Sequence, residues 1–131
     1  MAGTLSLALV TLLGLAAWLR PSDLGLGTHQ QLGLPPCSFR FLVHTRCPTC
    51  GMTTAWAHAV RGQVAEGLRA NAGGVLLAAL AAAAAPWLAL SAARGRWLGP
   101  RPRINALAVL SVVWAAVVLV EWIVRLYFMS K

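Results

Sequence analysis

The sequence predicts an all-α integral membrane protein with three transmembrane helices. The chain has 131 residues, of which 59% are hydrophobic and 11% charged, whereas an average soluble domain has roughly 45–50% and 25%. A water-soluble chain of this size has too much surface for its volume to hide so many apolar side chains. The same composition excludes intrinsic disorder, which requires low hydrophobicity and high charge.

Three apolar stretches are the expected spans, because a transmembrane helix needs about 20 mostly apolar residues. They cover about residues 4–19, 72–93 and 104–124 of a single membrane domain, residues 1–131. Pro86 is expected to kink the second span. The first stretch resembles a signal peptide in position, but it lacks a basic n-region and a small-x-small cleavage site. We therefore expect it to be retained as a span.

The charge distribution favours lipid over nucleic acid as the partner. The net charge is +8, and the basic residues lie mostly between the apolar stretches, where they meet anionic lipid headgroups. No nucleic-acid-binding motif is present in the sequence. The positive-inside rule places the loop between the second and third spans in the cytoplasm. Four arginines lie in that loop: Arg94, Arg96, Arg101 and Arg103.

An acidic residue in the third span has two interpretations. Glu121 lies one turn before Arg125, so the two side chains can pair at i and i+4. A proton or ion relay is one interpretation, since acids in spans are costly and often functional; the chain would then be a transporter fragment that has to oligomerise. A pair near the headgroups, with both side chains snorkelling outward, is the other. Trp122 and Tyr127 suggest interface depth and favour the second interpretation.

The segment 20–71 holds all the cysteines and histidines. It begins as a loop rich in Gly and Pro, and a short amphipathic helix is predicted after Gly51. Gly62 permits either one helix or two short ones that meet there, and Asn71 is the expected N-cap of the second span. We expect this piece to lie on the membrane surface or to pack on the spans. Its apolar stripe consists of Met52, Trp56, Val60, Val64 and Leu68.

The motif Cys47-Pro48-Thr49-Cys50-Gly51 has a first interpretation as part of a metal site. Two cysteines at this spacing can bind one ion, and the glycine permits a tight turn. Structural zinc requires four ligands, so other residues have to complete the set. The candidate metal ligands are Cys37, His44, Cys47 and Cys50, with His58 as an alternative fourth ligand.

Thiol redox chemistry and a structural role are the other interpretations. At a helix start with Pro48 in the first turn, the helix dipole would stabilise a Cys47 thiolate, and Cys50 would close the disulfide; the βαβ context of thioredoxin is absent. Alternatively, Cys37 bridges one of the two, or all three thiols are buried as small apolar side chains. The residues themselves leave these three interpretations open.

The stretch from the cysteine motif to Asn71 resembles the signature of the bacterial domain-of-unknown-function family 2752, which consists of small multi-span membrane proteins. Many members have Arg after the motif threonine, where this chain has Thr54. The resemblance implies a bacterial inner-membrane location and transfers no reaction. The matching positions are Cys37, Cys47, Pro48, Cys50, Gly51, Thr53, Arg61, Gly62 and Asn71.

These observations together predict a non-enzymatic membrane component. Its CPTCG segment would bind a metal, with zinc as the candidate cofactor, or a partner, which would be a second copy or another membrane protein. No catalytic residues are predicted, since the three acids lie in separate segments and offer no two-carboxylate site. The alternative is a membrane thiol–disulfide oxidoreductase that uses Cys47 and Cys50.

Overall fold

The computed structural model describes residues 1–99 and 103–129, and these residues form helices and connecting loops without a β-strand. This confirms the all-α prediction. Arg101, one of the four loop arginines used to predict topology, lies outside the described residues. The helices are α1 (Ala2–Trp18), the 3-10 helix η1 (Thr28–Leu32), α2 (Ser38–Val43), α3 (Met52–Ala59), α4 (Val64–Ala70), α5 (Ala72–Ala93) and α6 (Ile104–Met129).

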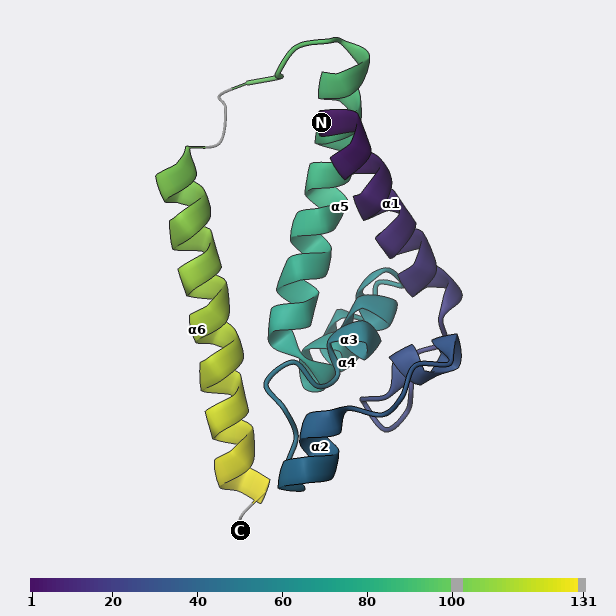
Figure 1. Ribbon diagram of the computed structural model, residues 1–131, viewed down its shortest axis with the longest axis vertical. Helices are drawn as coiled ribbons and strands as arrows, with labels where there is room; N and C mark the ends of the chain where they lie inside the picture. The colour runs from purple at the N-terminus through teal and green to yellow at the C-terminus, as the bar shows by residue number, and fades with distance from the viewer. Residues whose placement is uncertain (100–102, 130–131) are drawn as a thin grey trace.

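Helices α1 and α5 pack against each other as an antiparallel pair (Figure 1). Small residues lie in their contact, where a Cβ on Gly3 of α1 would meet Ala92 of α5 at 3.6 Å and Ala85 is 2% exposed. The hydroxyl of Ser6 donates a hydrogen bond of 2.9 Å to the carbonyl oxygen of Ala85 across this contact. Small residues and a hydroxyl at the interface are typical of helices that pack within a membrane.

Helix α6 contacts α5 mainly near the end of α5 that carries the cysteine segment (Figure 1). There the indole nitrogen of Trp114 donates to the carbonyl oxygen of Gly73 at 3.1 Å. A Cβ on Gly73 would lie 2.4 Å from Val118, so the glycine allows the close approach. Towards the other end of the molecule, α6 stands apart from α5 (Figure 1).

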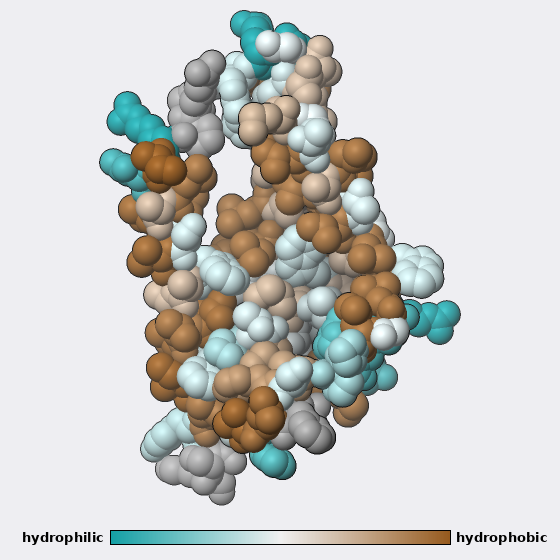
Figure 2. All heavy atoms as spheres, in the orientation of Figure 1, coloured by the Kyte–Doolittle hydropathy of each residue, from teal (hydrophilic) through white to brown (hydrophobic). Residues whose placement is uncertain are grey.

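Two of the described helices, α5 and α6, are long and apolar enough to cross a membrane. Only 6% of the most apolar part of α6 is buried, whereas the core helix of a soluble protein would be mostly buried. Figure 2 shows the apolar side chains of α6 at the molecular surface. Of the three predicted spans, two are therefore helices with the length and composition that a membrane span requires. Helix α1 has 17 residues and is about 26 Å long at ~1.5 Å per residue, shorter than a hydrocarbon core of about 30 Å.

The segment after the cysteine motif forms two short helices, α3 and α4. Gly62 lies between them with φ 75°, a conformation that glycine adopts without steric cost. The predicted apolar stripe is not the buried face, because Val64 and Leu68 are 49% and 46% exposed. The small residues are buried instead, and a Cβ on Gly67 would lie 2.9 Å from Val75 of α5. Close packing of α3 and α4 on α5 therefore buries the faces of these helices that carry small residues.

Candidate metal centre

The cysteine motif forms a turn that precedes α3. The amide of Cys50 donates to the carbonyl oxygen of Cys47 at 3.0 Å, and that of Met52 donates to Thr49 at 3.1 Å. Because α3 begins at Met52 with Gly51 as its N-cap, the expectation that Pro48 opens the helix is wrong. The two thiols are therefore presented by a turn rather than by the first turn of a helix.

Gly51 is required at its position by conformation and by space. Its φ is +88°, and an added Cβ would lie 2.6 Å from the carbonyl oxygen of Ala70 and 2.7 Å from that of Gly25. Both neighbours are backbone atoms, so no side chain can turn away to make room. The turn is thus clamped between the end of α4 and the loop that leads into η1.

The three cysteine sulfurs converge, although Cys37 lies ten residues before the motif. The Sγ atoms of Cys37 and Cys47 are 3.6 Å apart, and those of Cys47 and Cys50 are 2.9 Å apart. All three sulfurs lie within 4.8 Å of one another and are half-buried. The distance of 2.9 Å exceeds the length of a disulfide bond, about 2.05 Å. Three converging thiols are a donor set for a soft metal ion.

The thiol of Cys50 is held in its neutral form. Burial first, and then the side-chain hydrogen bond shared with Cys47, which favours the neutral thiol, raise the pKa of Cys50 from 9.0 to about 12. A thiolate here has lost part of its hydration and lies beside a second sulfur, and both effects disfavour the anion. A bound cation would reverse this balance, because a metal-coordinated thiol is deprotonated.

The sulfurs open into a cavity of about 300 Å³, whose wall also includes His29 and Thr49. The position of His29 could not be predicted from its sequence context, because it is a single histidine in a glycine-rich loop. Of the predicted ligands, His44 is exposed and is not part of the group within 4.8 Å. His58, the alternative ligand, has its Nδ1 2.8 Å from Oε1 of Gln63.

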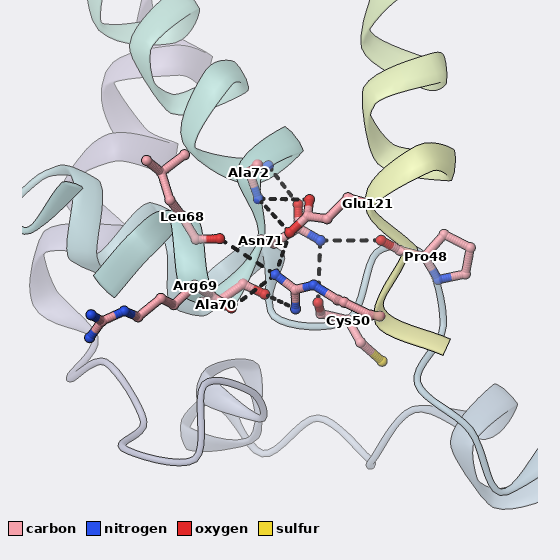
Figure 3. Close-up of polar contacts among 10 residues, drawn as sticks. Pro48, Cys50, Leu68, Arg69, Ala70, Asn71, Ala72 and Glu121 are labelled. Atoms are coloured by element: carbon pink, nitrogen blue, oxygen red, sulfur yellow. Dashed lines mark hydrogen bonds and ion pairs between the residues drawn. The ribbon is translucent and has the colours of Figure 1, made fainter. Parts of the chain in front are cut away.

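Asn71 connects the cysteine turn to the start of α5 (Figure 3). Its Oδ1 accepts a hydrogen bond of 2.7 Å from the amide of Gly74, which confirms the predicted N-cap. Its Nδ2 donates to the carbonyl oxygens of Pro48 at 3.2 Å and Cys50 at 3.3 Å. One side chain, only 3% exposed, therefore fixes both the helix and the turn that carries the thiols.

Glu121 and Arg125 of α6 form the predicted ion pair, and Glu121 points at the junction of α4 and α5 (Figure 3). The carboxylate accepts from the amide of Ala72 at 2.8 Å. The guanidinium donates to the carbonyl oxygens of Ala70 at 2.8 Å and Arg69 at 2.9 Å. The pair thus stabilises the positive end of α5 and the negative end of α4, rather than snorkelling away from the protein.

A second contact from α6 reaches the motif itself. The indole nitrogen of Trp122 donates to the carbonyl oxygen of Arg46, the residue before Cys47. Together with Asn71, this contact holds the motif against both candidate spans.

Arg61 holds the other side of the site. Its guanidinium donates to the carbonyl oxygens of Ala17 and Leu19, both at 2.7 Å, at the end of α1. Arginine at a helix C-terminus satisfies carbonyls that have no partner within the helix. Arg61 therefore ties α1 to the segment that carries the thiols.

Two buried threonines connect η1 to α3. The hydroxyls of Thr28 and Thr54 are 2.7 Å apart, and both residues are fully buried. Thr54 stands where the resemblance implies Arg in many members, and here its hydroxyl anchors η1 instead. The loop that carries His29 is thereby fixed beside the cysteine turn.

Comparison with known proteins gives a match for the part of the chain that contains the site. No curated protein and no solved structure matches the chain. Residues 37–85 match the model of a family described as "Protein of unknown function (DUF2752)". The match begins at Cys37 and ends in α5, so it includes the three cysteines, α3, α4 and Asn71. This segment is thus similar to the DUF2752 family, the family that the cysteine motif resembles.

Proposed function

We propose that this protein is a non-enzymatic component of the bacterial inner membrane that binds one zinc ion through the thiolates of Cys37, Cys47 and Cys50. The observation that carries the proposal is the convergence of three sulfurs within 4.8 Å of one another. Tetrahedral coordination with Zn–S bonds of ~2.3 Å places sulfurs about 3.8 Å apart. The Cys37–Cys47 distance of 3.6 Å already agrees with that value.

Binding requires only small movements of the sulfurs. The Cys47 and Cys50 sulfurs, 2.9 Å apart, have to separate by about 1 Å to reach the tetrahedral spacing. The positive charge of the ion would also offset the burial and the neighbouring sulfurs that raise the pKa of Cys50. A fourth ligand would complete the site, and His44 is the candidate that the sequence analysis gives, with His58 as the alternative.

The metal site would lie at one face of the membrane. Helices α5 and α6 cross it, and α1, packed along α5, is embedded as a third and shorter span that a slight thinning of the bilayer accommodates. Arg94, Arg96 and Arg103 lie at the opposite end from the thiols, and the positive-inside rule assigns that end to the cytoplasm. The cysteine segment then faces the outer side of the inner membrane, where a second copy or another membrane protein could contact it.

Thiol–disulfide exchange is the second candidate, favoured by the 2.9 Å between the Cys47 and Cys50 sulfurs. In this reaction the Cys47 thiolate attacks a partner's disulfide, and a mixed disulfide forms as one partner thiolate leaves. The Cys50 sulfur, after losing its proton, then displaces the second partner sulfur. Two electrons and two protons pass to the partner, which becomes a dithiol.

The experiment that separates the candidates is elemental analysis combined with thiol counting on detergent-purified protein. The proposal predicts about one zinc per chain, lost in Cys47→Ser and retained in Ser38→Ala, an exposed neighbour of Cys37 that serves as the control. Metal-free protein with a reversible Cys47–Cys50 disulfide would instead support the redox candidate. Metal content unaffected by Cys47→Ser would contradict the zinc site.

A further inference from the structure

We propose that His29, rather than a residue near the motif, supplies the fourth ligand to the metal held by the three cysteines. This inference rests on the proposed metal site and identifies its complete ligand set. The site would then be Cys₃His, a combination common for structural zinc. It would join η1 to the cysteine turn through the ion.

The position of His29 is the first argument. Among the three histidines of the chain, it is the one that lines the cavity into which the cysteine sulfurs open. Its side chain is half-exposed, so the imidazole has room to turn. It is not within 4.8 Å of all three sulfurs, and coordination therefore requires a rotation of the side chain towards them.

The anchoring of η1 is the second argument. Thr28, the residue before His29, is fully buried, and its hydroxyl is fixed by Thr54 at 2.7 Å and by the amide of Ser22 at 3.2 Å. The carbonyl oxygen of Gly25 packs so closely on Gly51 that no Cβ fits between them. The backbone beside His29 is thus fixed against the cysteine turn, while the imidazole itself is left to turn.

The other histidines are placed less well for this role. His44 is exposed and follows α2 with φ 56°, and the ring of His58 is hydrogen-bonded to Gln63 at the turn between α3 and α4. Neither lines the cavity of the sulfurs. A neutral imidazole binds zinc at about 2.0–2.1 Å, so His29 needs no additional charged group to act as a ligand.

The test is titration of the metal-free, detergent-purified protein with Co²⁺, whose visible bands report tetrahedral thiolate coordination. Wild-type protein and His44→Ala are expected to give the same bands at one Co²⁺ per chain. In His29→Ala the affinity is expected to fall at least tenfold, with altered bands. A second variant, His29→Cys, is expected to bind Co²⁺ with the spectrum of four sulfur ligands.

The outcomes distinguish this inference from the proposal beneath it. If His29→Ala and His29→Cys both give the wild-type spectrum and affinity, His29 is not a ligand, while the three-thiolate site stands. If the loss occurs in His44→Ala instead, the fourth ligand is His44 and the inference is overturned. If Cys47→Ser binds Co²⁺ as the wild type does, the metal site itself is refuted.

Discussion

The side-chain nitrogen of Asn71 donates a hydrogen bond to the carbonyl oxygen of Cys50 at 3.3 Å, while its oxygen caps α5. Helix α5 is a candidate span, so this one side chain fixes the position of the cysteine turn relative to a membrane helix. Through this contact, the cysteine motif, which lies outside the spans, is held in a fixed position beside the start of α5.

Replacement of Asn71 by alanine is expected to destabilise the protein and to loosen the cysteine turn. Loss of an N-cap costs about 0.5–2 kcal/mol, and the carbonyls of Pro48 and Cys50 lose their donor as well. Thermal unfolding in detergent should show a lower midpoint for Asn71→Ala, and alkylation of Cys50 should be faster. Asn105→Ala, at an exposed position of α6, is the matched control. Equal midpoints for the two variants would contradict this role of Asn71.

Replacement of Gly51 by alanine is expected to disrupt the site more than replacement of Gly62. Both glycines have positive φ, but an alanine Cβ at Gly62 meets open space, whereas at Gly51 it meets two carbonyl oxygens within 2.7 Å. Backbone strain alone costs on the order of 1–3 kcal/mol, and both variants share it. Metal content should therefore fall in Gly51→Ala and persist in Gly62→Ala. Comparable metal content in the two would show that the clamp on the turn is unimportant.

Glu121 is expected to be a structural residue. In Glu121→Ala, Arg125 and the amide of Ala72 both lose a partner in a part-buried site. An unpaired buried group costs about 1–3 kcal/mol, so thermal unfolding should show a clear loss of stability. Glu66→Ala, an exposed acid on α4, should have little effect. Unchanged stability of Glu121→Ala, together with loss of proton uptake in proteoliposomes, would favour the relay interpretation.

The ionisation of Cys50 can be followed by alkylation at different pH values. Its pKa is raised from 9.0 to about 12, and only the thiolate reacts with iodoacetamide. Between pH 8 and pH 10 the thiolate fraction of an ordinary thiol rises about tenfold, whereas that of a thiol with the raised pKa rises about a hundredfold. Mass spectrometry of the metal-free protein should show the steeper dependence for the peptide that contains Cys50. A plateau above pH 9 would contradict it.

The local features of the fold could be predicted from the sequence, because short-range rules determine them. Asn71 precedes an apolar run, and Glu121 and Arg125 are one helical turn apart. Their tertiary partners could not be predicted, since the α4–α5 junction that they stabilise forms only after packing. The composition of α1 also predicted more than its length supports. Its apolar stretch predicts a span, yet the helix has 17 residues and is shorter than α5 and α6.

The thiol site likewise has a part that could be predicted from the sequence and a part that could not. The Cys47 and Cys50 spacing predicts that two sulfurs meet, because the turn is local. Cys37 joins them through a loop, and His29 lines their cavity because a buried pair of threonines fixes η1. No periodicity or spacing in the sequence encodes the Thr28–Thr54 contact. The buried face of α3 was also mispredicted, because close packing on α5 favours Ala55 and Ala57 over larger apolar side chains.

The most direct test of the account is zinc-edge X-ray absorption on the zinc-loaded, detergent-purified protein. The account predicts three sulfur ligands at about 2.3 Å and one lighter ligand at about 2.0–2.1 Å. A first shell of nitrogen and oxygen alone would contradict the claim that Cys37, Cys47 and Cys50 hold the metal.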